Sequence, residues 1–222
     1  GGDTFEGGKG DDRMIWNNGD GSDLMKGGEG TDVVEVNGAN DQGDEFVLQA
    51  NQGKAIFDRL NLVPFKLTVD DAEKFEVNGG GGNDSFTVKD LTGTDVKSVS
   101  FSGGDGNDIF NASATAVSVV ANGDAGHDSL IGGSANDTLR GGEGNDTLVG
   151  FRGGDTFEGG KGDDRMIWNN GDGSDLMNGG EGTDVVEVNG ANDQGDEFVL
   201  QANQGKAIFD RLNLVPFKLT VD

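Results

Sequence analysis

The sequence contains no cysteine and no tyrosine, only two prolines and a single histidine. Without cysteine, the chain can form neither a disulfide nor a thiolate metal site. Basic residues are also scarce, since 16 Lys and Arg stand against 41 Asp and Glu and give a formal net charge of −25. This charge excludes nucleic acid as an expected partner and disfavours an anionic membrane surface, because both repel a polyanion. It favours a cation as the ligand.

Long apolar runs are absent as well. No stretch approaches the roughly eighteen apolar residues of a membrane span, so we expect none. The 42 glycines and the excess of acid lean towards disorder by composition alone, because glycine is costly to order and like charges repel. The chain begins GGDTFEGG and reads as an excerpt from a longer protein. It has no Ser/His/Asp set, no Cys/His set and no phosphate loop, so we expect no enzymatic activity.

The chain contains a long internal repeat. Residues 153–222 repeat residues 1–70 at an offset of 152, with Lys26 replaced by Asn178 as the one difference. Such near-identity indicates a tandem array in the parent protein, and an artificial duplication is the alternative.

A shorter period of nine residues lies within this repeat. Contiguous units of the form G-G-x-G-x-D-x-U-x, with U a large apolar residue, begin at Gly123, Gly132, Gly141, Gly150 and Gly159. The aspartate at position six and the apolar residue at position eight recur in every unit. A flexible glycine-rich linker has no reason to keep an apolar residue at every eighth position, so the pattern predicts an ordered repeat.

The residue types in this unit suit a calcium turn. Calcium is a hard cation that takes six to eight oxygen ligands, often carboxylates and backbone carbonyls. A turn whose carbonyls converge on an ion needs glycine for its positive φ angles. The three residues x-U-x form a minimal strand, with U pointing inward.

The pattern resembles the RTX (repeats-in-toxin) family of haemolysin-type calcium-binding nonapeptides. The resemblance covers residues 1–35, 79–87, 103–111 and 123–187. It implies an all-β fold, a right-handed parallel β-roll in which two nonapeptides make one coil and ions lie between successive turns, on the order of ten ions in all. It also implies that the position-six carboxylates and the carbonyls of positions one to four are the ligands. The implied metal residues are Asp3, Asp12, Asp23, Asp32, Asp84, Asp108, Asp128, Asp137, Asp146, Asp155, Asp164, Asp175 and Asp184, with Gly8, Gly10, Gly19, Gly21, Gly28, Gly30, Gly80, Gly82, Gly104, Gly106, Gly133, Gly142, Gly144, Gly153, Gly160, Gly162, Gly171, Gly173, Gly180 and Gly182.

The segments without full motifs still read as strands, and the spacing suggests one solenoid throughout. We expect RTX turns over 1–35, a wider-coil parallel solenoid over 36–122 with isolated turns at 79–87 and 103–111, a β-roll over 123–187, and a second wider-coil segment over 188–222. A same-side series of turns then predicts about seven coils per 152 residues: Asp32, Lys54, Asp84, Asp108, Asp128, Asp146, Asp164 and Asp184. In that series the ammonium of Lys54 partly replaces an ion; an exposed lysine in a plain turn is the alternative.

Three other residues are candidates for function. His127 is the lone histidine and falls at position five of a turn, where a solvated residue is expected rather than a catalytic one. Trp16 and Trp168 follow strands, and we expect them to cover the edge of the core, with glycan stacking as the alternative.

These observations favour a calcium-dependent structural segment of a secreted tandem-repeat protein, such as a stalk, fibril, matrix or surface-layer element. The alternatives are a calcium-folding appendage of a secreted protease, lipase or polysaccharide-modifying enzyme, and an adhesin that binds a glycan or cell surface. The expected partners are calcium, neighbouring copies of the repeat and a cell surface or polysaccharide. The resemblance implies type I secretion, with the chain unfolded in calcium-poor cytosol and folded outside the cell.

Overall fold

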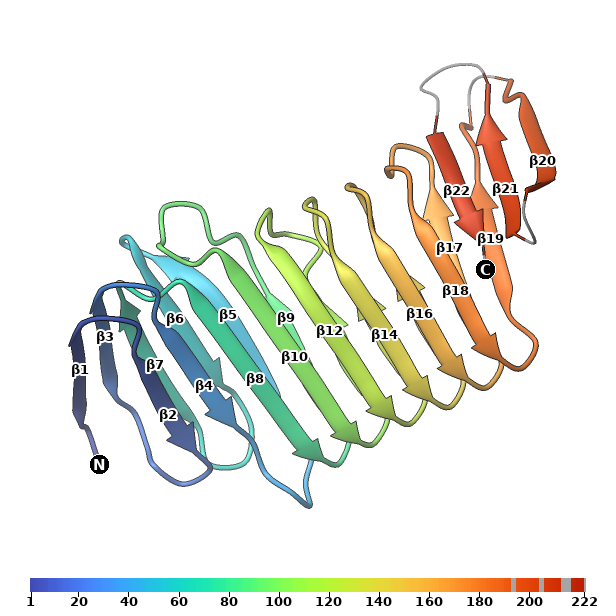
Figure 1. The fold of residues 1–222 in the computed structure, drawn as a ribbon. Coiled ribbons are helices and arrows are strands. Elements are labelled where there is room, and N and C mark those ends of the chain that lie inside the picture. The colour runs from blue at the N-terminus through green and yellow to red at the C-terminus, as the bar shows by residue number, and fades with distance from the viewer. Residues whose placement is uncertain (193–194, 204–205, 213–216, 222) are drawn as a thin grey trace.

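The computed structural model describes residues 1–192, 195–203, 206–212 and 217–221, and this part of the chain consists of strands and turns without a helix. The chain winds as a β-solenoid of about nine coils. In Figure 1 the coils follow one another from the N-terminal strands at the left to the C-terminal strands at the right. Since the described residues contain no helix, none of their segments is a long apolar helix that could cross a membrane.

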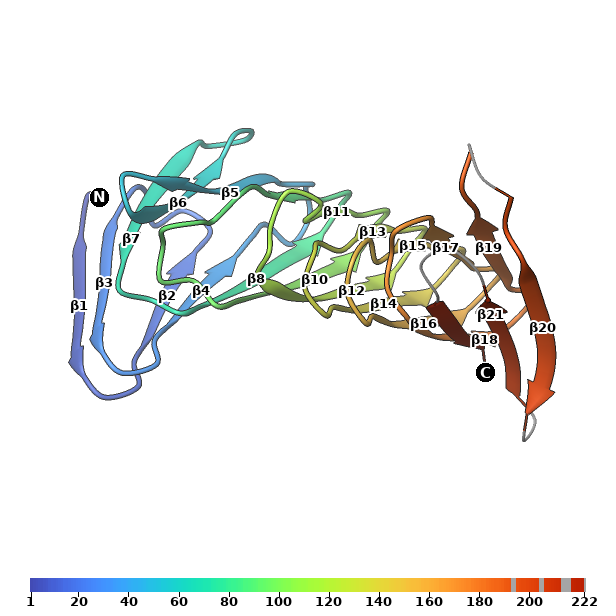
Figure 2. The ribbon, with the colours of Figure 1, turned by 90° about the horizontal axis from the view of Figure 1, so that it is seen from above.

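Each coil contributes to two facing sheets, which appear as two layers in Figure 2. Sheet I contains, in spatial order, β1 (Thr4–Lys9), β3 (Leu24–Glu29), β7 (Phe65–Asp70), β6 (Lys54–Arg59), β5 (Glu45–Asn51), β9 (Ser85–Val88), β11 (Ile109–Asn111), β13 (Ser129–Ile131), β15 (Thr147–Val149), β17 (Arg165–Asn169) and β19 (Val185–Asn189). Sheet II contains β2 (Arg13–Asn17), β4 (Val33–Asn37), β8 (Lys74–Gly81), β10 (Ser98–Asp105), β12 (Ser118–Ala125), β14 (Thr138–Glu143), β16 (Thr156–Lys161), β18 (Leu176–Glu181), β22 (Phe217–Val221), β21 (Lys206–Arg211) and β20 (Phe198–Asn203).

The apolar residue of each nonapeptide builds the core between the sheets. Leu130 pairs with Leu148, and Leu148 pairs with Met166, so that identical positions of successive coils stack in register. All three side chains are fully buried. A strand of three residues buries little surface by itself, and only the stack of coils makes a continuous core, as in other solenoids. The expected parallel β-solenoid is therefore confirmed.

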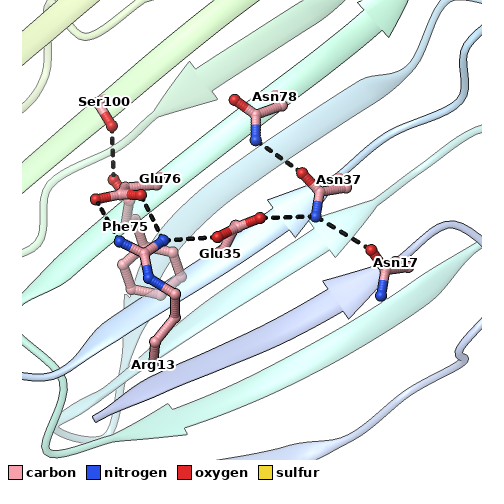
Figure 3. Close-up of polar contacts among 8 residues, drawn as sticks. All are labelled: Arg13, Asn17, Glu35, Asn37, Phe75, Glu76, Asn78 and Ser100. Atoms are coloured by element: carbon pink, nitrogen blue, oxygen red, sulfur yellow. Dashed lines mark hydrogen bonds and ion pairs between the residues drawn. The ribbon is translucent and has the colours of Figure 1, made fainter.

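The outer face of sheet II carries polar ladders instead. Figure 3 shows Arg13 on β2 between Glu35 on β4 and Glu76 on β8, with N–O distances of 2.6 and 2.7 Å. Beside this trio, Asn37 donates from its side chain to Asn17, and Asn78 donates to Asn37. Side chains that face water thus pair along the solenoid axis, while their neighbours on each strand point into the core.

Residues 45–70 depart from the parallel solenoid. Strand β5 pairs with β6, and β6 with β7, in antiparallel fashion within sheet I. Gln52 and Gly53 connect β5 to β6 with φ angles of 52° and 84°, as a two-residue type I′ hairpin requires. The expected strands are present, but the expectation of parallel coils throughout residues 36–122 is wrong for this antiparallel meander. The described strands β20–β22 form the same meander in residues 188–222.

Lys54 is consequently not a member of the calcium-side stack. It begins β6, is partly exposed and forms an ion pair with Asp70 on β7. The proposed series fails at Asp32 as well, because Asp32 precedes β4 in sheet II, whereas Asp84 and the later members precede strands of sheet I.

Equivalent strands of the two copies lie in opposite sheets. Strands β1 and β3 belong to sheet I, but their copies β16 and β18 belong to sheet II; β2 and β4 belong to sheet II, but β17 and β19 belong to sheet I. Between β2 and β17 the chain changes sheet thirteen times. One 152-residue period is therefore six and a half coils, close to the expected seven, but the half coil moves residue 184 to the sheet opposite that of residue 32.

Candidate metal-binding turns

The position-six aspartates form two rows along the solenoid, one for each sheet that the turns enter. The first row enters sheet I and contains Asp3, Asp23, Asp44, Asp84, Asp108, Asp128, Asp146, Asp164 and Asp184. The second row enters sheet II and contains Asp12, Asp32, Asp137, Asp155 and Asp175, followed by Asp196. The second row is interrupted between Asp32 and Asp137, where the turns lack the nonapeptide motif.

Most aspartates of the rows tie their turn to the aspartate of the next coil. The backbone N–H of Asp128 donates to Oδ1 of Asp146 at 2.8 Å, and that of Asp146 donates to Oδ1 of Asp164 at the same distance. The same bond joins Asp84 to Asp108 and Asp108 to Asp128. This ladder uses one oxygen of each carboxylate and leaves the other, Oδ2, for a different partner.

A second ladder runs the opposite way through position five, and the sequence pattern did not reveal it. The N–H of His127 donates to Asn107, and the N–H of Asn145 donates to Nδ1 of His127 at 2.7 Å. The side chain of Asn107 accepts the bond from His127, and the backbone N–H of Asn107 donates to the side chain of Asn83. The expectation of a plain solvated His127 is thus only partly right, because the exposed ring links two coils and accepts at an unprotonated Nδ1.

In many turns of the two rows, the second carboxylate oxygen is buried and has no protein partner. Oδ2 is orphaned in eight aspartates of the described chain: Asp12, Asp32, Asp84, Asp108, Asp128, Asp146, Asp155 and Asp164. A buried polar atom without a partner is costly, so these oxygens call for a ligand that the protein itself does not provide.

The glycine at position one shapes the space beside each orphan oxygen. A Cβ at Gly7 would lie 2.6 Å from Oδ2 of Asp12 and 2.7 Å from the carbonyl oxygen of Gly27, one coil further on. A Cβ at Gly123 would likewise strike Oδ2 of Asp128 and the carbonyl of Gly141. Glycine thus leaves a cradle where a carboxylate and carbonyls meet, which is the oxygen donor set that calcium prefers. Among the described residues no three acidic or histidine side chains converge, so backbone carbonyls would complete each shell.

Burial strongly disfavours the charged form of these carboxylates. Desolvation, reinforced by neighbouring aspartates, raises the pKa of Asp84 to about 7 and that of Asp155 to about 8. Burial is the largest cause again at Asp128, Asp146 and Asp175, where the pKa rises to about 6. A row of buried carboxylates without a counter-cation is the electrostatic arrangement that a divalent cation would relieve.

Most glycines implied as ligands take the conformation that the turn needs. The glycines at positions two and four, such as Gly142 and Gly144, have φ angles between about 99° and 152°. Gly133 and Gly173 are exceptions with no positive φ.

The carbonyls of Gly21 and Gly173 accept the indole N–H of Trp16 and Trp168 at 2.7 and 2.9 Å. Both tryptophans are buried, which rules out glycan stacking in the described chain.

Three described turns do not fit an ion, namely those at Asp137, Asp44 and Asp196. In the turn at Asp137, Oδ1 accepts the N–H of Val119 and Oδ2 accepts the N–H of Gly133, so both oxygens have partners. In the turn at Asp44, Oδ1 accepts from Arg59 and Oδ2 accepts from Ala39. Asp196 is the copy of Asp44, and its Oδ1 accepts from Arg211 and its Oδ2 from Ala191.

The sequence pattern did not identify Asp44, because one extra residue, in GANDQGDEF, breaks the nine-residue register. Glu73, which accepts the N–H of Asp32 in place of an aspartate, was missed for lack of any motif.

The family of the chain follows from its matches. A family model described as the RTX calcium-binding nonapeptide repeat (4 copies) matches residues 1–15, 18–42, 99–115, 120–148, 149–167 and 170–194. The chain belongs to this family. RTX repeats bind calcium, and the family implies a secreted protein in a type I secretion context.

Matches to individual proteins are weak. A solved structure that matches is that of the extracellular lipase LipA from Serratia marcescens, with 18% identity and a TM-score of 0.25. The match covers 99% of this chain and 36% of the lipase chain. No curated protein sequence matches.

The fit of the RTX turns to calcium is good where Oδ2 is orphaned. The position-six carboxylates of those turns would hold the ion together with carbonyls of positions one to four. When bound, calcium supplies positive charge that neutralises the rows. The protein's own contribution is to keep each Oδ2 buried and aimed at the position-one glycine, and to hold the coils in register through the two opposed ladders.

Proposed function

We propose that this chain is a calcium-dependent structural segment of a long secreted protein built from tandem 152-residue copies, and that it serves as a rod in a stalk, fibril, matrix or surface layer. No set of residues in the described chain resembles a catalytic constellation, and the acidic side chains are used in stacked turns rather than as an isolated acid–base pair. Within this proposal the chain is not an enzyme.

The observation that carries the proposal is the seamless join between the copies. Residue 153 begins the second copy, yet the first row runs without interruption from Asp146 to Asp164 across it. Strand β14 of the first period pairs with β16 of the second, and β15 pairs with β17. A junction that keeps both sheets and the aspartate ladder supports indefinite extension by further copies.

Calcium would act as the folding switch of this rod. Orphaned carboxylates with raised pKa values oppose a calcium-free stack, because they are buried charges without partners. Binding free energy then becomes folding free energy. With chelator, we expect a largely disordered chain, and with millimolar calcium we expect β-structure by circular dichroism. Magnesium should substitute poorly, because it demands an octahedral shell and gives up water reluctantly.

The proposal is tested with proteins of two, four and six consecutive 152-residue copies, imaged by electron microscopy in calcium and in chelator. Six and a half coils spaced at about 4.8 Å, with extra meander strands on one face, predict that each copy adds roughly 30–40 Å of length. Length that does not grow with copy number would contradict the rod. Equal ordering in chelator would contradict the switch.

A further inference from the structure

The turn at Asp44 belongs to the first row by its backbone. Its N–H donates to Oδ1 of Asp84, as other members of the row donate to the next aspartate. A Cβ at Gly38 would strike Oδ2 of Asp44 and the carbonyl of Gly79, which is the same crowding that surrounds the orphaned oxygens elsewhere. Asp44 is also as deeply buried as its neighbours in the row. The backbone and the position-one glycine of this turn thus match those of the calcium-binding turns in the row.

Its carboxylate differs from theirs in having partners. Oδ2 of Asp44 accepts the N–H of Ala39 at 2.7 Å, and Oδ1 faces Nη1 of Arg59 at 3.1 Å. The side chains of this ion pair are 0% and 1% exposed. Asp84, the next member of the row, has an orphaned Oδ2 instead.

The guanidinium of Arg59 is held in place from several directions. Nε and Nη2 donate to the carbonyl of Val63 at 3.1 and 2.8 Å, and Nη1 also donates to Asn18 at 2.8 Å. The rings of Trp16 and Phe65 lie against it, with centroids 5.5 and 5.2 Å from Cζ. Its positive charge is therefore fixed and dry, conditions under which a buried ion pair holds.

The second copy repeats the arrangement in the other sheet. Arg211 pairs with Asp196 at 3.2 Å, donates to Asn170 at 2.7 Å and lies 5.5 Å from the ring of Trp168. The N–H of Ala191 donates to Oδ2 of Asp196. The same cluster forms in both copies although they lie at different places in the stack. The cluster is therefore determined by the repeated sequence.

We propose that the turn at Asp44, and its copy at Asp196, bind no calcium, because a backbone N–H already occupies Oδ2 and the tethered guanidinium at Oδ1 supplies the positive charge that an ion supplies elsewhere. This inference builds on the calcium role of the other turns. The two regions should therefore differ in their need for calcium. The meander coil contains its own cation, Arg59, and should stay ordered at calcium concentrations too low to fill the turns of residues 123–167.

The core of the meander supports that division. Phe57 on β6 packs against Phe46, Phe65, Phe75 and Phe86, with ring centroids 5.2 to 6.2 Å apart. A coil of the motif-rich stack buries one large side chain per half coil, such as Leu139 or Leu148. Large aromatic side chains bury more apolar surface than leucine does, so the meander depends less on bound ions.

The test compares neighbouring members of one row, Asp44→Asn and Asp84→Asn, in the full chain at saturating calcium. Bound ions are counted by equilibrium dialysis with atomic absorption. We expect Asp44→Asn to bind as many ions as the parent protein and Asp84→Asn to lose at least one. A loss in Asp44→Asn equal to that in Asp84→Asn overturns the proposal. If neither variant loses an ion, the calcium role of the whole row fails, and this inference fails with it.

A second measurement needs no variant and covers the case in which Asp44→Asn does not fold. Hydrogen exchange of the parent chain in chelator should show stronger amide protection in residues 45–70 than in residues 123–167. Equal exchange in the two segments, or weaker protection in the meander, overturns the proposal.

Discussion

Residues 1–70 and 153–222 have one sequence, apart from Lys26 and Asn178, and their equivalent described strands lie in opposite sheets of one solenoid. The local structure is nevertheless the same. Trp16 and Trp168 stack on Phe65 and Phe217 with identical centroid distances of 3.7 Å, and both copies fold residues of the same sequence into an antiparallel meander. Local structure is therefore encoded within each copy, whereas the sheet that a copy joins depends on how many half coils precede it.

The surroundings of the copies differ where a neighbouring coil is present on one side only. Leu48 lies on β5 inside the stack, where β5 pairs with β9, and is 0% exposed in the core. Its copy Leu200, on the edge strand β20, is 69% exposed. The single substitution is tolerated in either context. Lys26 pairs with Glu6 in the first copy, and Glu158 in the second pairs with Arg140 from the preceding strand.

The largest expected effect comes from changing the number of half coils. Deletion of the nonapeptide 141–149 should move the second copy into the sheets of the first. In the parent chain Arg140 pairs with Glu158 across β14 and β16, so Arg140→Cys with Glu158→Cys should form a disulfide. In the deletion variant Ile131→Cys with Glu158→Cys should form one instead, because β16 then follows β13 in sheet I.

The matched control deletes 132–149, two nonapeptides, and restores the sheet of the second copy. Glu158 then lies beside Asn122 in sheet II, and Asn122→Cys with Glu158→Cys should be crosslinked. The chain has no cysteine of its own, so mass spectrometry reads these bonds directly. An unchanged Arg140–Glu158 pairing after deletion of a single nonapeptide would show that the sheet is not set by counting half coils.

The next largest effect separates Leu48 from Leu200. Leu48→Asp buries an unpaired charge in the core and should cost several kcal/mol. Leu200→Asp should lower the free energy of unfolding by less than about 0.5 kcal/mol, as expected for an exposed site. Denaturant unfolding in saturating calcium measures both. Similar losses for the two variants would mean that the second meander is covered in solution.

A smaller effect is expected at equivalent aspartates. Asp164 accepts from Asp146 and donates to Asp184, whereas its copy Asp12 donates to Asp32 and accepts no such bond within residues 1–222 as described. Asp164→Ala should weaken two neighbouring calcium turns and raise the calcium midpoint of folding more than Asp12→Ala, which weakens one. Calcium titration followed by circular dichroism compares the midpoints, and equal shifts would argue against coupling along the row.

The smallest effect is that of pH on the calcium-free chain. Burial raises the pKa of Asp155 to about 8 and that of Asp146 to about 6, above the unfolded value of about 4. The folded state therefore binds more protons, and stability is present at low pH and is lost as pH rises through these values. Lowering pH from 8 to 5 in chelator should increase protection of residues 123–167 in hydrogen exchange. Decreased protection would contradict the raised pKa values.

The sequence predicted the motif-rich part of the molecule well, because there the register alone fixes the strands. Each x-U-x at Leu130, Leu139 and Leu148 forms a buried strand, and the aspartates two places earlier form the rows. Stacking with a period of about 18 residues leaves few other ways to bury the apolar positions.

The meander was mispredicted because the nine-residue period was extended into a segment that follows a different rule. The stretch VLQANQGKAIFD has two apolar runs separated by Gln52 and Gly53, which is a hairpin signal that outweighs the spacing. The cation of this segment was sought at Lys54, which the spacing indicated, and lies at Arg59, which no spacing indicates. Contacts across coils, such as Arg59 to Asn18, depend on the three-dimensional stack and have no local signature.

The unequal strand count around each meander has a mechanical consequence. Sheet I takes four strand steps from β3 to β9, while sheet II takes two from β4 to β10, an excess of about 10 Å on one face. The axis must curve away from that face, and the next meander, in the other sheet, curves it back. A fibre of many copies would thus be a wave rather than a straight bar. Under tension it would lengthen first by flattening its bends, giving a soft elastic phase in a force–extension curve before any strand pairing breaks.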